Sequence, residues 1–343
     1  MINITNYIKS MNVHSQLVSK YLAMLSPKNA ESALNLFHNT ALSLSQREKN
    51  YEALRQLGSQ LKEIFKQRII ESNKIAKAMG YANHLEYFLT LNAMALEDFK
   101  SFVENIDKFI SSVQCESVAI ERSSETKDWS IFSIPSPEGI FYMENKFDVP
   151  SQILDLVSTY DSRIAKYRNK IDMKLDDDSY SGVKYLEGEN KVRIRLRKDI
   201  EDLDRALVFV QGLGNALDLL DCVENKITPH ISKYLQDYSA IEFTHKFIRR
   251  EISEKGQMLI KYNMLHDLVY TLFEIEVFVN DKQDFDIAYA KAINRCYPTA
   301  RQTENPLYVF DSRFIVRPLG MLIQNMVDME LYLKKGESSS DML

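Results

Sequence analysis

Glutamate and histidine three residues apart could supply metal ligands or an acid–base pair, and Glu242 and His245 have this spacing. Because a helix turns once in about 3.6 residues, both side chains would share one face of the helix predicted there. A Glu-x-x-His pair is typical of di-metal carboxylate proteins, which need a matching pair from another helix. The sequence offers no such second pair, so an ion pair or a hydrogen-bonded histidine is the simpler interpretation.

A second polar set lies in residues 205–218, which read Arg-Ala-Leu-Val-Phe-Val-Gln-Gly-Leu-Gly-Asn-Ala-Leu-Asp. Apolar residues recur there at three-and-four spacing and predict a helix, with Gln211, Asn215 and Asp218 on a neighbouring face. A zinc-peptidase helix carries H-E-x-x-H, in which two histidines hold zinc and the glutamate activates water. Here Gln211 and Asn215 stand at the histidine positions, and Gly212 stands at the glutamate position.

Two glycines, Gly212 and Gly214, lie inside this predicted helix. Each costs about 1 kcal/mol relative to alanine, which indicates either a close approach by another backbone or an inherited feature. Periodicity alone is equally satisfied by a buried amphipathic helix with polar residues at its edge. That simpler alternative needs no functional site.

The composition is that of an ordinary globular protein with long helices. The 343 residues are 45% hydrophobic and 27% charged, with ten glycines, eight prolines and a formal net charge of −5. In the richest basic stretch, residues 191–198, basic residues alternate with apolar ones, which predicts a strand whose basic face is solvated. Nucleic acid is therefore not expected as a partner.

The chain also lacks the marks of a disulfide-rich or membrane protein. Its three cysteines are widely spaced and form no Cys/His cluster, so no disulfide framework, cysteine-held zinc or other cofactor is expected. The N-terminus does not read as a signal peptide, and no stretch reads as apolar enough to span a membrane. We therefore expect a cytoplasmic protein without a membrane partner.

Helical patterns dominate the chain and predict one domain. A helix is expected over 43–79, ending at Gly80. Asn83 is expected to cap the next helix, and Glu86, three residues later, completes a pair that resembles a capping box. Residues 151–172 and 200–335 are also expected to be helical. One mostly helical, peptidase-like domain is expected at 1–335, with N-terminal helices at 1–45, and a disordered tail at 336–343. Loop or short-strand insertions are expected at 121–150 and 176–198. Within the second insertion, residues 183–185 and 192–196 are expected to form a hairpin.

The helix at 205–218 and its flanks resemble the catalytic domain of the thimet oligopeptidase and oligoendopeptidase F family, whose motif is H-E-x-G-H-A-x-H. Gly214, Ala216 and Leu217 match the framework of that motif. The family's third zinc ligand is a glutamate within D-x-x-E-I. The corresponding run here is Asp-Tyr-Ser-Ala-Ile at 237–241, which places Ala240 at the ligand position.

Other segments resemble the family in the same order along the chain. Residues 77–81, Lys-Ala-Met-Gly-Tyr, followed by Leu-Glu-Tyr at 85–87, are similar to a Gly-Tyr region of the family. Residues 313–319 match a run in which the family carries tyrosines and a histidine near the reacting carbonyl. Those tyrosine positions are Ile315, Val316 and Leu319 here, with no histidine nearby. The similarity covers residues 45–335, and most of the family's N-terminal region is missing.

The resemblance implies a mainly α fold, with a large multi-helix metallopeptidase-like catalytic domain, a deep channel and one or two short β-hairpins. It also implies that zinc hydrolysis is lost, because no metal ligand stands at Gln211, Asn215 or Ala240 and no base at Gly212. The first hypothesis is therefore an inactive homologue that binds a peptide on the edge of the hairpin. The residues expected to contact that peptide are Tyr180, Tyr185, Gln211, Asn215, Glu242 and His245.

Two alternatives remain open at this stage. The chain could be a scaffold or regulatory subunit in a hetero-complex with an enzyme, in which case an exposed apolar surface would matter more than the old channel. It could also be an enzyme with chemistry that does not use zinc. Asp218, Glu242 and His245 would then be the candidate acids and bases.

Overall fold

A computed structural model of the chain describes residues 4–24, 43–116, 150–159, 161–176, 182–197, 202–226, 233–252, 254–297, 307–310 and 318–340. The chain divides into two compact units, a division that the single predicted domain did not include. Unit 1 comprises residues 1–91, 110–138 and 262–325, and unit 2 comprises residues 92–109, 139–261 and 326–343. The predicted insertion at 121–150 lies, except for Pro150, outside the described residues.

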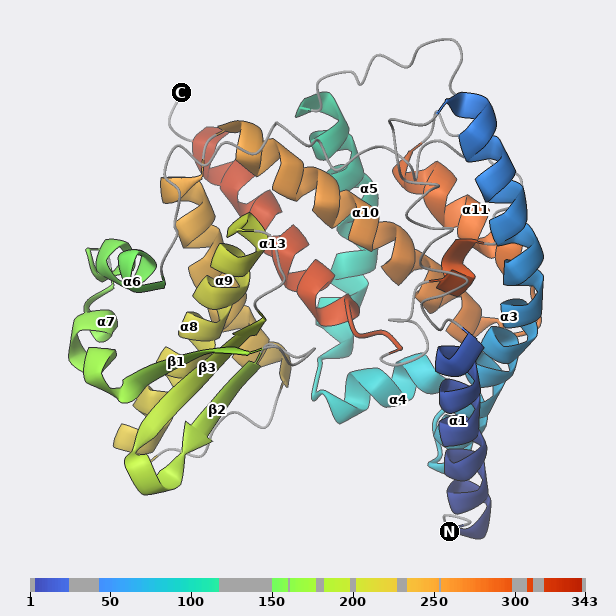
Figure 1. Cartoon of the computed structure of the whole chain (residues 1–343), viewed down its shortest axis with the longest axis horizontal. Helices are drawn as coiled ribbons and strands as arrows, with labels where there is room; N and C mark the ends of the chain where they lie inside the picture. The colour runs from blue at the N-terminus through green and yellow to red at the C-terminus, as the bar shows by residue number, and fades with distance from the viewer. Residues whose placement is uncertain are drawn as a thin grey trace. The chain divides into compact units, whose positions relative to one another are not determined.

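Unit 1 is helical in its described part (Figure 1). Its own elements are α1 (Ile4–Met24), α3 (Leu44–Ala78), α4 (His84–Leu91), α11 (Phe285–Cys296) and the short η4 (Leu307–Phe310). Three further helices contribute residues to both units, and these are α5 (Leu96–Glu116), α10 (Glu254–Val279) and α13 (Leu322–Ser340).

Helix α3 begins and ends where its sequence predicts. Ser43 accepts a hydrogen bond from the Gln46 backbone, and the Gln46 side chain accepts one from the Ser43 backbone N, which forms a capping box. At the other end Gly80 has φ +95°, a conformation that L side chains rarely adopt. The backbone N of Glu86 then donates to Asn83 Oδ1, which caps α4 as expected.

Aromatic side chains form the core of unit 1. The rings of Phe65 and Phe273 lie 4.9 and 4.8 Å from that of Tyr308, and Phe285 and Tyr289 surround the same ring. Burial raises the pKa of Tyr308, whose hydroxyl donates to Asp286 at 3.0 Å. The hydrogen bond satisfies a polar group that would otherwise be costly inside this core.

Unit 2 combines helices with a small sheet of strand order β1-β3-β2. Its elements are α6 (Pro150–Ser158), α7 (Ser162–Tyr167), η2 (Arg168–Lys170), β1 (Ile171–Asp176), β2 (Gly182–Leu186), η3 (Glu187–Glu189), β3 (Lys191–Arg197), α8 (Asp202–Glu224) and α9 (Lys233–Glu251). The predicted hairpin is confirmed, because β2 pairs antiparallel with β3 and Val183 lies opposite Ile194.

Strand β1 was not predicted, because residues 151–172 were expected to be helical throughout. Helix α7 instead ends at Tyr167, and β1 pairs parallel with β3, with Asp172 opposite Arg193. Arg193 Nε donates to Asp172 Oδ2 at 2.6 Å across this pair. The parallel pairing joins segments about 20 residues apart, so no local sequence pattern predicts it.

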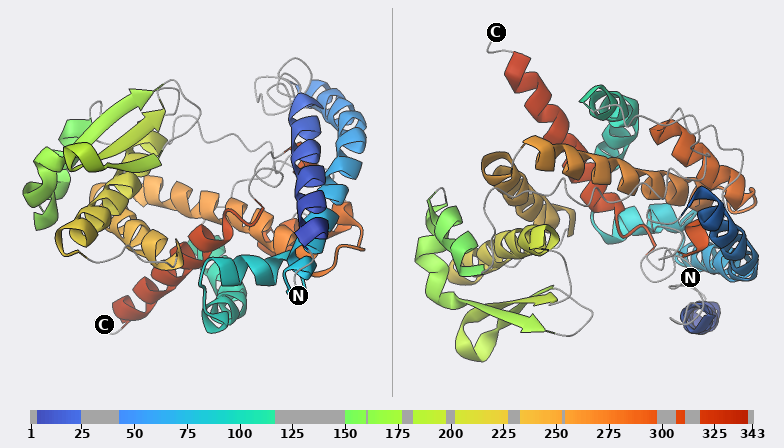
Figure 2. Two further views of the ribbon diagram at one scale, coloured as in Figure 1. Left: turned by 90° about the horizontal axis from the view of Figure 1, so that it is seen from below. Right: turned by 45° about the horizontal axis from the view of Figure 1, so that its top comes forward.

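Helix α8 packs against one face of this sheet (Figure 2). Val192, Ile194 and Leu196 of β3 are buried, and Val183 and Tyr185 of β2 pack against the same core. The intervening positions of β3 carry Lys and Arg residues, as the alternation predicted for a solvated face.

The expectation that no stretch is apolar enough to span a membrane is corrected for one helix. Residues Ala206–Glu224 of α8 reach the length and mean hydropathy, 1.4, of a membrane span. The apolar side chains Phe209, Val210, Leu213 and Leu217 are fully buried within the protein. A core helix passes the same test, so this finding is weak support for a membrane span.

Helix α13 extends to Ser340, past Gly336, where the disordered tail was expected to begin. Its described part buries both apolar side chains and a charged one. Leu322, Met326 and Val327 are among its buried apolar residues, whereas Asp328 is a buried carboxylate.

Unit 1 also contains a buried group of ionisable side chains. Arg68 of α3 and Glu274 of α10 are 2% and 3% exposed, and burial lowers the pKa of Arg68 while the Glu274 charge opposes that shift. Within the described part of the chain, the Nδ1 atoms of His14 and His84 are buried without a hydrogen-bond partner. Burial first, and the Arg68 charge second, lower the pKa of each histidine from 6.5 to about 4.

The unfolding free energy should therefore fall as the pH decreases from 6.5 towards 4. Over this interval the unfolded chain binds protons at His14 and His84 that the folded chain excludes, so protonation favours unfolding. The stability is fully retained above pH 6.5. Urea denaturation at a series of pH values would measure the slope, and His84→Phe, which keeps an aromatic ring beside Phe278, should flatten it. An equal slope in the variant would contradict this assignment.

Candidate functional site

The polar side chains of α8 lie on one face of the helix. Because each residue turns a helix by about 100°, Gln211, Asn215 and Asp218 lie within one narrow sector. All three are half-buried, whereas Leu213 and Leu217 on the opposite side are fully buried. We call Gln211, Asn215 and Asp218 the polar strip.

Gly214 brings α8 into close contact with α9 on one flank of the polar strip. A Cβ added at Gly214 would lie 2.9 Å from Ala240 Cα and 3.3 Å from Phe243 Cβ, so a side chain would collide with the α9 backbone. Ala240 is fully buried at this crossing. The contact places position 240 beside the helical turn that runs from Gln211 to Asn215.

Gly212 faces the sheet on the other flank of the polar strip. A Cβ at this position would lie 3.0 Å from Ile194 Cγ2 and 3.5 Å from Val183 Cγ2. These neighbours are side-chain methyl groups rather than backbone, so a shift of a few tenths of an ångström by Ile194 would make room for the Cβ. The predicted close approach by another backbone is therefore found at Gly214 and not at Gly212.

The four positions aligned with the zinc motif are therefore brought together, but their side chains do not fit a zinc ion. Zinc in proteins is held by imidazole, thiolate or carboxylate groups. Gln211 and Asn215 offer neutral carboxamides, Ala240 a methyl group and Gly212 only a hydrogen atom. Among the described residues, no group of three or more His, Cys, Asp or Glu side chains could hold a metal ion.

Asp218, a candidate acid or base, forms an ion pair instead. Arg163 of α7 donates from Nη1 to Asp218 Oδ1 at 3.1 Å and from Nη2 to Asp161 Oδ2 at 2.9 Å. Burial alone would raise the pKa of Asp161, but the hydrogen bonds from Arg163 outweigh burial and lower it. This end of the polar strip is therefore a structural junction between α7 and α8.

The Glu242–His245 pair is not formed in the structure. Glu242 is exposed, whereas His245 Nε2 lies 2.7 Å from Asp328 Oδ1 of α13. Both side chains of the His245–Asp328 pair are almost buried, at 12% and 11% exposure. Helix α9 is thus tied to α13 through the histidine, and sequence reasoning missed Asp328, which lies 83 residues away.

The remaining predicted contacts are only partly described. Tyr180 lies outside the described residues, and the Tyr185 hydroxyl donates to Asn190 Oδ1 at 2.9 Å in the hairpin turn. Ile315 and Val316 also lie outside the described part. Leu319, in unit 1, has φ +58°, and its backbone N donates to Glu274 at 2.9 Å.

No protein-family profile and no curated protein sequence matches the chain. Solved structures do show the same fold. A Pz peptidase A in complex with an inhibitor has a TM-score of 0.60 at 12% identity, over 95% of this chain and 65% of that one. A protein assigned as oligoendopeptidase F has a TM-score of 0.59 at 11% identity, over 95% and 65% of the respective chains. An oligoendopeptidase F homologue from Bacillus anthracis has a TM-score of 0.52 at 12% identity, over 90% and 63%.

These similarities establish a relationship at the level of the fold. The mainly α metallopeptidase-like class with a short hairpin, expected from the sequence, is confirmed. The chain spans somewhat less than two thirds of the length of these structures. The deep channel of the family stays a prediction, because each unit is described by itself.

The contacts of α8 predict unequal outcomes for two similar substitutions. Gly214→Ala should lower the unfolding free energy by about 1–2 kcal/mol, because the new methyl group meets the Ala240 backbone, which cannot move aside. Gly212→Ala should change it by less than about 0.5 kcal/mol, since a better helix propensity offsets the close contact with a side-chain methyl group of Ile194. Chemical denaturation of both variants would test this, and equal effects would argue against close packing at Gly214.

Proposed function

We propose that this chain is an oligopeptidase-like protein that binds a peptide and does not hydrolyse it. The observation that carries the proposal is the contact of Gly214 with Ala240, which keeps the third ligand position of the family beside the turn from Gln211 to Asn215. In this proposal the frame of the zinc site is retained, whereas its ligands are replaced. A frame kept without its chemistry is best explained by a retained binding role.

The sheet supports the peptide part of the proposal. Strand β2 has a partner on one side only among the described residues, so its outer edge can pair with an extended peptide. Val183 of β2 contacts the α8 turn at Gly212, which brings this edge close to the polar strip. Backbone groups of a peptide on β2 could then bond to the carboxamides of Gln211 and Asn215.

The proposed loss of hydrolysis follows from the absence of a general base and of metal ligands at the aligned positions. Gly212 has no group that could accept a proton from water, and three missing ligands leave no site for the ion that would activate it. Asp218 and His245 are each engaged by a neighbouring helix through Arg163 and Asp328. We therefore propose a protein that needs no zinc and no other cofactor.

An alternative role as a subunit of a hetero-complex is favoured by one observation on α5. Leu96 and Val103 are 54% and 39% exposed and lie two turns apart, so they share one face of the helix. A partner protein could cover these side chains. In that case the polar strip would have no role in binding.

The peptide hypothesis is tested by screening unstructured peptides of 8 to 12 residues against the purified protein. We expect some to bind, to remain intact by mass spectrometry and to be unaffected by a metal chelator. The double substitution Gln211→Leu with Asn215→Leu should weaken such binding about tenfold, by removing two peptide hydrogen bonds. The control Asn225→Leu, at the exposed residue that follows α8, should not weaken binding.

Cleavage of the peptides would overturn the proposed inactivity. Binding that is unchanged in the double variant would remove the polar strip from the site. An absence of binding, together with recovery of a stoichiometric protein complex, would favour the subunit alternative.

A second test restores the metal ligands by Gln211→His, Gly212→Glu, Asn215→His and Ala240→Glu. The quadruple variant should bind one zinc ion per chain, measured by metal analysis, and zinc should raise its Tm. Ala240→Glu alone should be destabilising, because it buries an unpaired carboxylate between α8 and α9. A folded quadruple variant that binds no zinc would contradict the alignment. Hydrolysis is not expected to return, because Leu319 and its aligned neighbours lack tyrosine hydroxyls.

A further inference from the structure

Strand β1 forms one edge of the sheet in unit 2, and β2 forms the other (Figure 1). Among the described residues, β1 pairs only with β3, so no strand lies beside the backbone groups on its outer side. Such an edge can accept a further strand, and proteins restrict which strand that is through the charged side chains placed on it. We call the outer side of residues 171–176 the β1 edge.

The side chains of β1 alternate between the two faces of the sheet. Ile171 and Met173 are half-buried and pack against the apolar core of unit 2. Leu175 follows on the same face and is 47% exposed. Asp172 and Lys174 lie on the opposite face. The β1 edge therefore carries an apolar row on one face and a charged row on the other.

Both charged side chains of the β1 edge already interact within the chain. Asp172 Oδ2 accepts a hydrogen bond from Arg193 at 2.6 Å, and Lys174 also has an interaction of its own. The Asp172 side chain is nevertheless 35% exposed and Lys174 is exposed, so a neighbouring strand can reach both. A strand added to this edge would thus be selected by the charges that it places opposite these two residues.

The sequence of β1 is complementary to itself in one antiparallel register. In a symmetric pair of β1 strands, the two-fold axis passes between one residue and its own copy, and opposed residues project from the same face. With Met173 on the axis, Asp172 of each copy lies opposite Lys174 of the other, and Ile171 lies opposite Leu175. Opposite charges and apolar side chains in directly opposed positions both stabilise paired strands.

The neighbouring symmetric registers place like charges opposite each other. With Asp172 on the axis, the two Asp172 carboxylates are opposed, and Lys170 lies opposite Lys174. With Lys174 on the axis, the two Lys174 ammonium groups are opposed. Like charges in directly opposed positions are destabilising. The charges of β1 therefore favour one register and disfavour a shift in either direction.

We propose that the β1 edge binds the β1 edge of a second copy of this chain, antiparallel and with Met173 on the two-fold axis. The two three-stranded sheets then form one continuous sheet, and the exposed Leu175 is covered by Ile171 of the second copy. Six residues of strand are only about 20 Å long, which is short for a protein interface. The dimer is accordingly weak, with a Kd on the order of 10–100 µM.

This inference goes beyond the proposed function and does not rest on it. The proposed peptide pairs with β2, at the opposite edge of the same sheet. The dimer leaves that edge open, so a substitution on β1 that dissociates the dimer should leave peptide binding unchanged.

Sedimentation equilibrium of the full chain, over a concentration series that brackets the expected Kd, tests for the dimer. Lys174→Glu turns both Asp172–Lys174 pairs into like-charge pairs and should weaken dimerisation about tenfold or more. Lys184→Glu makes the same change of charge at an exposed position of β2 and should have no effect.

Exchanging the charges tests the register. Asp172→Lys should also weaken the dimer, because the new side chain lies opposite Lys174. An equal mixture of Asp172→Lys and Lys174→Glu should instead form a heterodimer, since every opposed pair at these positions then joins opposite charges.

A cross-link gives an independent measurement, because Asp172→Lys also removes the ion pair with Arg193. Met173→Cys places two thiols opposite each other across the axis, with Cβ atoms about 5 Å apart, so mild oxidation should join two chains by a disulfide. Mass spectrometry should locate this disulfide at position 173. Lys184→Cys, on β2, should give no such link.

Several results would overturn the inference. One is a chain that stays monomeric throughout the concentration series. Others are a dimer that Lys174→Glu and Lys184→Glu weaken equally, or one that oxidation does not link through position 173, since either would place the contact elsewhere. Dimerisation through β1 together with an absence of peptide binding would contradict the proposed function and leave this inference standing.

Discussion

The approach of α8 to α9 at Gly214 is the constraint on which the organisation of unit 2 depends. The two backbones are so close that even a methyl group at position 214 would meet Ala240 Cα at 2.9 Å. The same helix contacts the sheet through Gly212 on its other flank. Two glycines in one helix cost about 2 kcal/mol of helix propensity together, so the close packing on both flanks must offset that cost.

This packing explains how the arrangement of α8 and α9 is maintained without a metal ion. The distance between α8 and α9 is set by backbone contact and by buried apolar side chains such as Leu213, Leu217 and Phe247. None of these contacts requires a metal ion. The side chains of the polar strip can therefore differ without a change in the arrangement of the helices.

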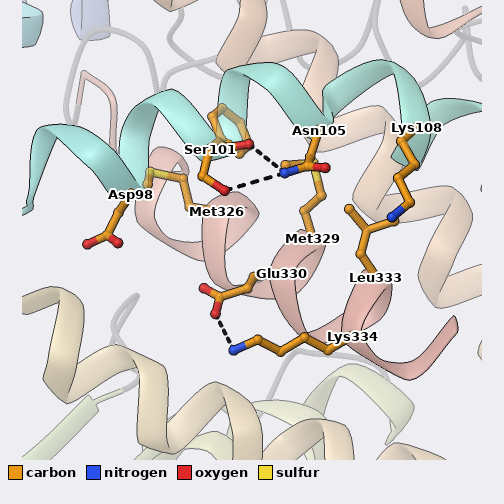
Figure 3. A pocket seen from close by; sticks show the side chains of 10 residues that line it. Asp98, Ser101, Asn105, Lys108, Met326, Met329, Glu330, Leu333 and Lys334 are labelled. Carbon is orange, nitrogen blue, oxygen red and sulfur yellow. Dashed lines mark hydrogen bonds and ion pairs between the residues drawn. The ribbon is translucent and has the colours of Figure 1, made fainter. Parts of the chain in front are cut away.

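Helix α13 joins two parts of unit 2 that have different chemical character. Its Asp328 binds His245 of α9 in an almost buried pair, and Glu330 and Lys334 meet Tyr238 of the same helix. On another side, Met326 and Met329 line a hollow between α5 and α13 (Figure 3). A single helix thus packs against both α9 and α5.

Local patterns determined much of the secondary structure from the sequence alone. The stop at Gly80, the cap at Asn83 and the alternation of β3 depend on residues within a turn or two, so each could be predicted from the local sequence. The special role of Gly212 and Gly214 was also visible, because glycine is costly inside a helix.

Only the tertiary structure decided which polar groups meet. Asp218 pairs with Arg163, His245 pairs with Asp328, and β1 pairs with β3, and none of these partners follows from spacing along the chain. The hollow between α5 and α13 likewise combines residues more than 200 positions apart. Such pairings depend on the path of the folded chain, and sequence periodicity reports only on the faces of each separate element.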